Sequence, residues 1–211
     1  MIIKWLGHAS FLLKVLDKAF YIDPYAGDYV EQADVILITH RHGDHCDVEK
    51  IAAVQRSDTV IVTSSDCASI LDGNVITLSP GDRRNIHGVE VEAVEAYNYK
   101  RFRSPGVPFH PKGTQIGFIL SAQGKQIYHA GDTDFIPEMT ELNDIDVALL
   151  PIMGRATMDL EEAVEAAVAI HPKIAIPMHR RDASAEEFKE KVETQSNVKV
   201  LAIKEGDEID P

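Results

Sequence analysis

Thr39-His40-Arg41-His42-Gly43-Asp44-His45 places three histidines and one aspartate within six consecutive residues, at the end of the apolar run 34–39. Imidazole nitrogens and carboxylate oxygens are the usual ligands of Zn²⁺ and its neighbours. A surface loop that happens to be rich in histidine is the alternative, but only nine histidines occur in 211 residues, so three in six positions are not expected by chance. One ion does not easily accept four ligands from so short a stretch, whereas two neighbouring ions can share them. The stretch therefore predicts a metal site.

The segments around this stretch predict a layered α/β fold. Residues 34–39 suit a strand buried on both faces, and the segments 2–6, 10–15 and 19–22 predict an antiparallel meander before it. Further strands are expected at residues 59–63, 75–78, 89–94, 115–121, 125–129, 147–150, 173–177 and 198–203. Helices are expected at residues 47–55, 65–71, 159–170 and 184–192. Strands lead into helices in both halves, which favours an αββα sandwich in a single domain over residues 1–211, with the polar residues 204–211 frayed.

Composition limits the kind of partner. The formal net charge is −13, so the surface as a whole would repel a nucleic-acid backbone. The longest apolar runs are too short to span a bilayer, and no membrane association is expected. Cys46 and Cys67 do not suggest a disulfide framework and the first residues lack the layout of a signal peptide, so we expect a cytoplasmic protein. Assembly into a homo-oligomer is left open.

Two distant segments offer further metal ligands. Asp132 lies in Gly131-Asp132-Thr133-Asp134, directly beyond the predicted strand 125–129, and a carboxylate at a strand exit can bridge two ions. His179 follows the apolar run 174–178. Alone, the first could be a plain Gly-Asp turn and the second an ordinary strand end. Because both occupy strand exits, as the histidine cluster does, all three could converge on one edge of the sandwich.

These residues resemble the metal-binding pattern of the metallo-β-lactamase superfamily, namely His40-x-His42-x-Asp44-His45 followed by Asp132 and His179. The flanking blocks resemble, within it, the small metal-dependent hydrolases related to ascorbate-6-phosphate lactonase. These blocks are Trp5-Leu6-Gly7-His8-Ala9, Ile22-Asp23-Pro24, Tyr128-His129-Ala130-Gly131-Asp132-Thr133, Leu149-Leu150-Pro151 and Ile176-Pro177-Met178-His179. The resemblance runs from Met1 to about Phe188, nearly the whole chain, and the His-x-His-x-Asp-His element is highly specific.

The resemblance implies an αββα sandwich with two divalent metal ions at one edge. Zn²⁺ is the expected metal, and Mn²⁺ and Fe²⁺ are alternatives. By position, the ligands of the first ion would be His40 and His42, and those of the second would be Asp44, His45 and His179, with Asp132 as the bridge. The superfamily usually supplies a third first-ion histidine after a mid-chain strand. Here the segment Glu95-Ala96-Tyr97-Asn98 has none. His110 is the nearest substitute, and Asn98 is a weaker one.

Three more residues are expected close to the ions without binding them. Asp23, at a strand exit, could accept a ring N–H from a ligand histidine and orient it, although an Asp-Pro turn explains it equally well. His8 and His129 match positions of the hydrolase subgroup near its site. For both, a buried, hydrogen-bonded structural histidine is favoured over a direct ligand.

Basic residues gather in the segment 97–114, against the acidic balance of the chain. It contains Lys100, Arg101, Arg103 and Lys112 but no Asp or Glu, and its prolines and glycines predict an irregular loop. Arginine suits phosphate and carboxylate groups, so Arg101, Arg103 and Lys112, with Arg155 and Arg180 elsewhere, are candidate binders of a small anionic substrate. A solvated basic loop without a ligand is the alternative.

The expected reaction is hydrolysis of an ester, lactone or phosphoester bond by hydroxide that two ions generate from water. Asp132 would hold the pair of ions, and Asp44 would exchange a proton while it binds one of them. A phosphodiesterase or nuclease acting on short nucleic acid or a cyclic nucleotide is one alternative. A non-catalytic metal-binding protein with a degenerate first site is the other.

Overall fold

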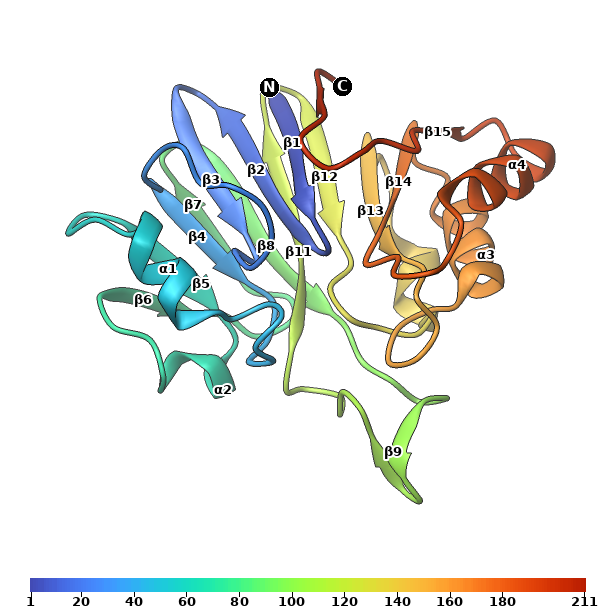
Figure 1. Ribbon diagram of the computed structural model, residues 1–211, viewed down its shortest axis with the longest axis horizontal. Coiled ribbons are helices and arrows are strands. Elements are labelled where there is room, and N and C mark those ends of the chain that lie inside the picture. Colours follow the sequence, from blue (N-terminus) through green and yellow to red (C-terminus); the bar gives the residue numbers. More distant parts are fainter.

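Two seven-stranded sheets pack face to face in the computed structural model, which describes residues 1–211 (Figure 1). The first sheet has the order β16 (Glu208–Ile209), β1 (Ile2–Gly7), β2 (Ser10–Val15), β3 (Lys18–Ile22), β4 (Val35–Ile38), β5 (Val60–Thr63) and β6 (Asn74–Thr77). The second has the order β15 (Lys199–Val200), β14 (Ile174–Met178), β13 (Val147–Pro151), β12 (Lys125–His129), β11 (Ile116–Ala122), β8 (Val89–Glu95) and β7 (Arg83–Ile86).

Each sheet is antiparallel on one side and parallel on the other. In the first sheet, β1, β2 and β3 form an antiparallel meander, and β3 to β6 then run parallel. In the second sheet, β7, β8, β11 and β12 are antiparallel, and β12 to β15 run parallel. Since the parallel strands need crossover connections, helices lie on the outer face of each sheet. The predicted meander and αββα sandwich are confirmed.

Three of the helices begin at polar side-chain caps that the sequence supplies. The helices are α1 (Val48–Val54), α2 (Ser65–Ala68), α3 (Leu160–Ile170), α4 (Ala185–Gln195) and the 3₁₀ turn η1 (Pro137–Glu141). Asp47 caps α1 by accepting two backbone N–H bonds, Asp159 caps α3 and Ser184 caps α4. None of these helices combines the length and the apolar character needed to cross a lipid bilayer.

Alternating residues of the central strands face two different cores. In β4, Val35 and Leu37 pack in the core between the two sheets, whereas Ile36 and Ile38 pack against α1 and α2. In β13 the core between the sheets receives Val147 and Leu149, and the layer under α3 and α4 receives Ala148 and Leu150. Burial on both faces explains why these strands are continuous apolar runs.

Several predicted elements differ from the structure. Residues 204–211 do not fray, because β16 pairs with β1 and Ile209 packs against the core between the sheets, so that prediction is wrong. The segment 97–114 contains a hairpin, β9 (Phe102–Ser104) and β10 (Val107–Pro108), that pairs only with itself and projects from the sandwich (Figure 1). The helix expected at 65–71 ends at Ala68. The strand expected at 198–203 is reduced to β15, Lys199–Val200. β7 is missing from the prediction because its Arg-Arg-Asn sequence lacks apolar alternation.

Asp34, directly before β4, connects β3 with the segment between α1 and β5. Its carboxylate accepts hydrogen bonds from the backbone N–H of Ala19 (2.9 Å) and from Lys18 Nζ (2.9 Å), and it also pairs with Arg56. Burial alone would raise the pKa of Asp34, but the Ala19 hydrogen bond and the two cations outweigh it and hold the pKa below its ordinary value. The folded state is therefore favoured when Asp34 is ionised.

Asp34→Ala should lower the free energy of unfolding by about 2 kcal/mol near neutral pH, because it removes the partner of Ala19 N–H and Lys18 and one of the two partners of Arg56. The contribution of Asp34 is full above its ordinary pKa of 3.8 and is lost as the pH falls through its lower folded-state pKa. Urea unfolding of both proteins should thus give a stability difference that narrows with acidification. Asp58→Ala is the control, because Asp58 pairs with the same Arg56 from an exposed position. A difference that stays constant across this pH range would contradict the assignment.

Candidate metal centre

The candidate site lies at the edge of the sandwich where the carboxyl ends of six strands meet. β1 and β3 both run antiparallel to β2, so β1, β3 and β4 end at the same edge of the first sheet. In the second sheet β8, β12 and β14 end together for the same reason. The residues that follow these six strands are His8, Asp23, the stretch Thr39–His45, Asn98, Asp132 and His179. The predicted convergence of the strand exits is therefore present in the fold.

Three histidines form the first group of candidate ligands. His42 Nδ1 lies 3.1 Å from His40 Nε2 and 3.0 Å from His110 Nε2. Ligand atoms about 2.0 Å from a tetrahedral ion are about 3.3 Å apart, so these separations suit a shared cation. His110 comes from the segment before β11 and fills the position that lacked a histidine after β8.

A second group lies on the other side of Asp132. It comprises His8, Asp44, His45 and His179, whose ligand atoms all lie within 4.8 Å of one another. His8 Nε2 is 3.3 Å from Asp44 Oδ2, and His179 Nε2 is 4.0 Å from the same oxygen. His8 thus joins the candidate ligands, although the sequence favoured a purely structural role.

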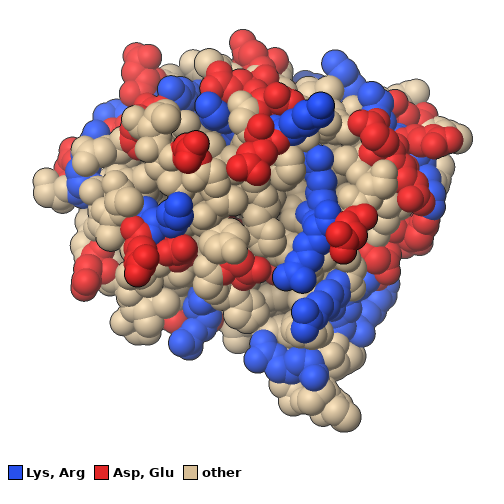
Figure 2. Space-filling model, viewed as in Figure 1, with Lys and Arg blue, Asp and Glu red and all other residues tan.

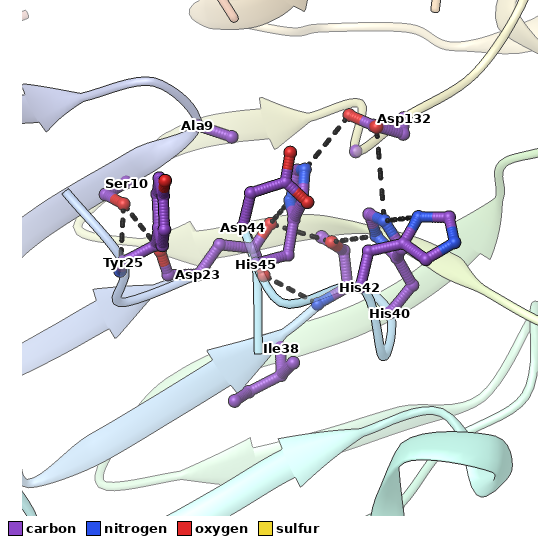
Figure 3. Close-up of polar contacts among 12 residues, drawn as sticks. Ala9, Ser10, Asp23, Tyr25, Ile38, His40, His42, Asp44, His45 and Asp132 are labelled. Carbon is purple, nitrogen blue, oxygen red and sulfur yellow. Dashed lines mark hydrogen bonds and ion pairs between the residues drawn. The ribbon is translucent and has the colours of Figure 1, made fainter. Parts of the chain in front are cut away.

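Asp132 connects the two groups with its two oxygens. Oδ1 lies 3.3 Å from His45 Nε2 and 3.5 Å from His179 Nε2, whereas Oδ2 lies 3.7 Å from His110 Nε2 and 4.0 Å from His40 Nε2. Figure 3 shows this carboxylate on the segment after β12, facing the histidines of the loop after β4. This is the arrangement that a bridging carboxylate requires.

Unpartnered buried atoms in this region fit cations. His45 Nε2, Asp132 Oδ1 and both ring nitrogens of His179 are buried and have no hydrogen-bond partner. Buried polar atoms are normally paired, because leaving one unsatisfied costs about 1–3 kcal/mol. A divalent cation would satisfy His45 Nε2, His179 Nε2 and Asp132 Oδ1 together, so the residues present fit the group that their chemistry suggests.

Burial keeps most of these imidazoles in the neutral form, which is the form that binds metal. It lowers the pKa of His110 and of His179 to about 4 and holds the pKa of His40 well below its ordinary value. His45 differs. Burial lowers its pKa, but Asp132 and Asp23 on opposite sides of the ring outweigh this and raise the pKa well above its ordinary value. Burial likewise raises the pKa of Asp132, but His45 and His179 hold it well below the ordinary value.

Asp23 fixes the orientation of two of the histidines. Its Oδ2 lies 2.7 Å from His45 Nδ1 and accepts a hydrogen bond from Thr39 Oγ1 at 2.7 Å. Since that hydroxyl donates to Asp23, it accepts from His40 Nδ1, which lies 3.0 Å away. Both rings therefore hold a proton on Nδ1 and turn Nε2 toward Asp132. Asp23 lies where the prediction put it, beside ligand histidines.

Asn98 and Asp134 perform the same task for His110. Asn98 Oδ1 accepts a hydrogen bond from the His110 backbone N–H and lies 2.7 Å from His110 Nδ1. The Asn98 amide donates in turn to Asp134 Oδ1 at 2.9 Å. His110 therefore has its Nδ1 proton held, and Nε2 faces His42. From the sequence, Asn98 is only a weak ligand candidate and Asp134 is not identified, although Asp134 stands in the same Gly-Asp-Thr-Asp block as Asp132.

His129 is a structural residue outside both groups. It is fully buried, and its Nε2 donates to the Ala9 carbonyl at 2.9 Å, while Nδ1 accepts from Gly131 N–H at 3.2 Å. These bonds tie β12 to the turn after β1. They also hold Gly131, whose φ of +65° suits glycine, directly before Asp132.

Three of the predicted substrate-binding cations are engaged elsewhere. Arg101 pairs with Asp134 (2.7 Å), Asp159 (2.9 Å) and Glu162, so its guanidinium is neutralised under the loop. Arg180 donates to the Pro177 and Ile203 carbonyls and stacks on Trp5, with 4.1 Å from its guanidinium carbon to the ring centroid.

Lys112 pairs with Glu138 at 2.7 Å and with Glu95 at 3.6 Å. Arg101, Arg180 and Lys112 are therefore paired with groups of the protein, and direct substrate binding by them stays a prediction. Arg155 is exposed and forms no ion pair, and its role stays a prediction.

A cavity of about 430 Å³ opens beside the first group. The residues that line it include His40, Arg41, His42, Arg103, Phe109 and His110. Arg103 donates to the Phe109 carbonyl at 2.8 Å and lies over the Phe109 ring. Figure 2 shows basic side chains gathered around the base of the projecting hairpin. Arg41, inside the histidine stretch, was not expected to line a cavity.

Comparison with known proteins agrees with this geometry. A family model described as the beta-lactamase superfamily domain matches residues 2–179. The UPF0173 metal-dependent hydrolase of Methanosarcina barkeri is 32% identical over 227 residues, covering 99% of this chain and 97% of that protein.

Solved structures agree as well. A protein of Parabacteroides distasonis assigned as a metal-dependent hydrolase superposes with a TM-score of 0.87 at 38% identity, over 94% of this chain and 90% of that one. Igni18, a metallo hydrolase from the hyperthermophilic archaeon Ignicoccus hospitalis, gives 0.82 at 26% identity over 99% and 97%. The fold, the ligand groups and these relatives lead to one conclusion: the chain belongs to the metallo-β-lactamase superfamily and is a metal-dependent hydrolase.

Proposed function

We propose that the two ligand groups hold two divalent cations, preferably Zn²⁺, and that the enzyme hydrolyses an ester, lactone or phosphoester bond of a small anionic substrate. The observation that carries this proposal is the placement of Asp132, whose two oxygens face two separate groups of imidazoles. One buried carboxylate between two such groups is best used by a pair of ions. His110 supports the pair, because it gives the first group a third histidine.

The cations would lower the pKa of a water molecule and stabilise the negative charge that develops on the substrate. The protein contributes a rigid arrangement around them. Asp23 and Asn98 hold the Nδ1 protons of the histidines, so that the Nε2 atoms of His45 and His110 stay directed inward. Asp44 has a side chain that is 37% exposed, whereas that of Asp132 is 5% exposed. Asp44 is therefore the carboxylate of the centre that solvent reaches, and we assign proton exchange to it, although the hydrogen bond with His8 holds its pKa below the ordinary value and opposes protonation.

The cavity beside the first group supports the class of substrate. Arg41 and Arg103 bring two exposed guanidinium groups to its lining, next to His42 and His110. A guanidinium group can bind two oxygens of one phosphate or carboxylate through two parallel hydrogen bonds. Phe109 and the neighbouring Val107 and Pro108 supply an apolar wall. A substrate with one anionic group and a short apolar part suits this lining.

The general surface supports a small substrate rather than a polymer. A net charge of −13 opposes a long nucleic-acid chain. Cys46 and Cys67 are both free thiols, with 3.2 Å between their sulfur atoms. Free buried thiols suit a reducing compartment, and we propose the cytoplasm as the location.

Chelation should abolish hydrolysis in a panel of phosphorylated lactones, lactones and phosphodiesters, and Zn²⁺, Mn²⁺ or Fe²⁺ should restore it. Elemental analysis should find two ions per chain in the wild-type protein. Asp132→Ala should bind fewer ions and lose at least about a hundredfold in kcat/KM, since both ligand groups lose an oxygen. Asp66→Ala is the control, because Asp66 lines the cavity without joining either group. Two firmly bound ions in Asp132→Ala would refute the bridging role.

Asn98→Ala should weaken binding of one ion by about 10- to 100-fold and leave the other unchanged, because only His110 loses the acceptor of its Nδ1 proton. Competition with a chromophoric chelator measures both affinities. Asn143→Ala, at an exposed asparagine, should bind both ions as the wild type does. Equal weakening of both ions would show that Asn98 acts on the fold and not on His110.

Arg41→Ala and Arg103→Ala should each raise KM for an anionic substrate by about tenfold with little change in kcat, because each removes a charged hydrogen-bond donor from the cavity. Arg84→Ala, on the outer strand β7, controls for the loss of one positive charge. A neutral substrate analogue should show no such increase. If KM for the anionic substrate stays constant in both variants, the anion binds elsewhere.

A further inference from the structure

His8 lies in the candidate centre but outside the His-x-His-x-Asp-His stretch. It follows β1, more than thirty residues before that stretch, and its side chain joins the second ligand group. Its ring lies against the ring of His179, with 3.7 Å between centroids, and edge-on to His45 at 5.5 Å. The only polar partner of its side chain is Asp44.

The backbone of His8 is fixed by its neighbours. Its carbonyl accepts hydrogen bonds from the backbone N–H of His179 (3.0 Å) and from Trp5 Nε1 (3.0 Å). Both His8 (φ 51°) and His179 (φ 47°) adopt the left-handed conformation, which is uncommon for a residue with a side chain. Such conformations cost free energy and persist where the surroundings impose them, often at functional sites. The two turns therefore position the two rings as a unit.

The distances separate two roles for His8. A hydrogen bond to Asp44 at 3.3 Å is long, whereas 3.3 Å lies within the range of separations between two ligand atoms on one zinc ion. His8 Nε2 also lies within 4.8 Å of the ligand atoms of His45 and His179, which a simple partner of Asp44 does not require. Its side chain is 15% exposed and opens to the same edge as Asp44.

We infer that His8 is a direct ligand of the second cation, together with Asp44, His45 and His179. This inference rests on the proposed two-ion centre. It makes the centre asymmetric, because the second cation has four ligands of its own besides the shared Asp132, and the first has three. The second cation should therefore bind more tightly and load first.

His8→Asn and His8→Gln test the inference in the full-length protein. Asparagine adopts the left-handed conformation readily but is too short to bind the ion, so His8→Asn avoids added backbone strain. Glutamine can still hydrogen-bond Asp44 but is a poor ligand. Titration with Zn²⁺ against a chelator should show a 10- to 100-fold loss for the tighter ion in both variants and no change for the weaker one. His110→Asn should instead weaken the weaker ion.

Cobalt provides a second measurement that does not depend on activity. In the Co²⁺-loaded wild-type protein, the ring N–H of each bound histidine gives a strongly shifted proton resonance. His8→Gln should remove one of these resonances, and His87→Gln, at an exposed histidine, should remove none. If His8→Gln keeps wild-type affinity and every shifted resonance, His8 only positions Asp44 and the inference fails. A wild-type protein that binds two ions but hydrolyses nothing would instead reject the proposed function.

Discussion

The buried carboxylate of Asp132 is the constraint on which the rest of the site depends. A lone ionised carboxylate in the interior is unfavourable, and this one is stabilised by imidazoles on both sides, His45 and His179 facing one oxygen and His40 and His110 facing the other. These four histidines come from three separate segments of the chain. Each segment must therefore place its histidine beside the Asp132 carboxylate. The function thus depends on the geometry of this edge of the sandwich.

The construction of the sandwich meets this condition. Three strands of each sheet contribute to the site from one edge, and a residue within three positions of each of these strand ends belongs to the site or supports it. The apolar strands themselves are ordinary, because they alternate between the core shared by the sheets and the layer beneath the helices. Polar partners then set the rings: Asp23 acts from the first sheet and Asn98 from the second. Asp23 thus supports one ring in each ligand group, His45 directly and His40 through Thr39, whereas Asn98 supports His110 of the first group.

The sequence predicts the parts of this arrangement that are local. Residues 34–45 contain both the strand and the ligands that follow it, and the apolar runs 125–129 and 174–178 similarly locate Asp132 and His179. Contacts between distant segments are not encoded in this way. Arg101 looks free in the sequence but is neutralised by carboxylates more than thirty residues away, and His110 is oriented by Asn98 across a loop. β7 and β16 are edge strands with little apolar character, so pairing rather than composition creates them.

The self-contained hairpin of β9 and β10 has a consequence for how such an enzyme changes. The hairpin belongs to neither sheet, yet Arg103 and Val107 on it line the cavity, and His110 follows it directly. Its tip can be lengthened or rewritten without disturbing the sandwich core, provided that the anchor at Asn98 and His110 is kept. Under the proposed function, cation binding and substrate selection would thus depend on adjacent but separable segments, and exchange of this hairpin would alter selectivity while the same ligand groups are kept.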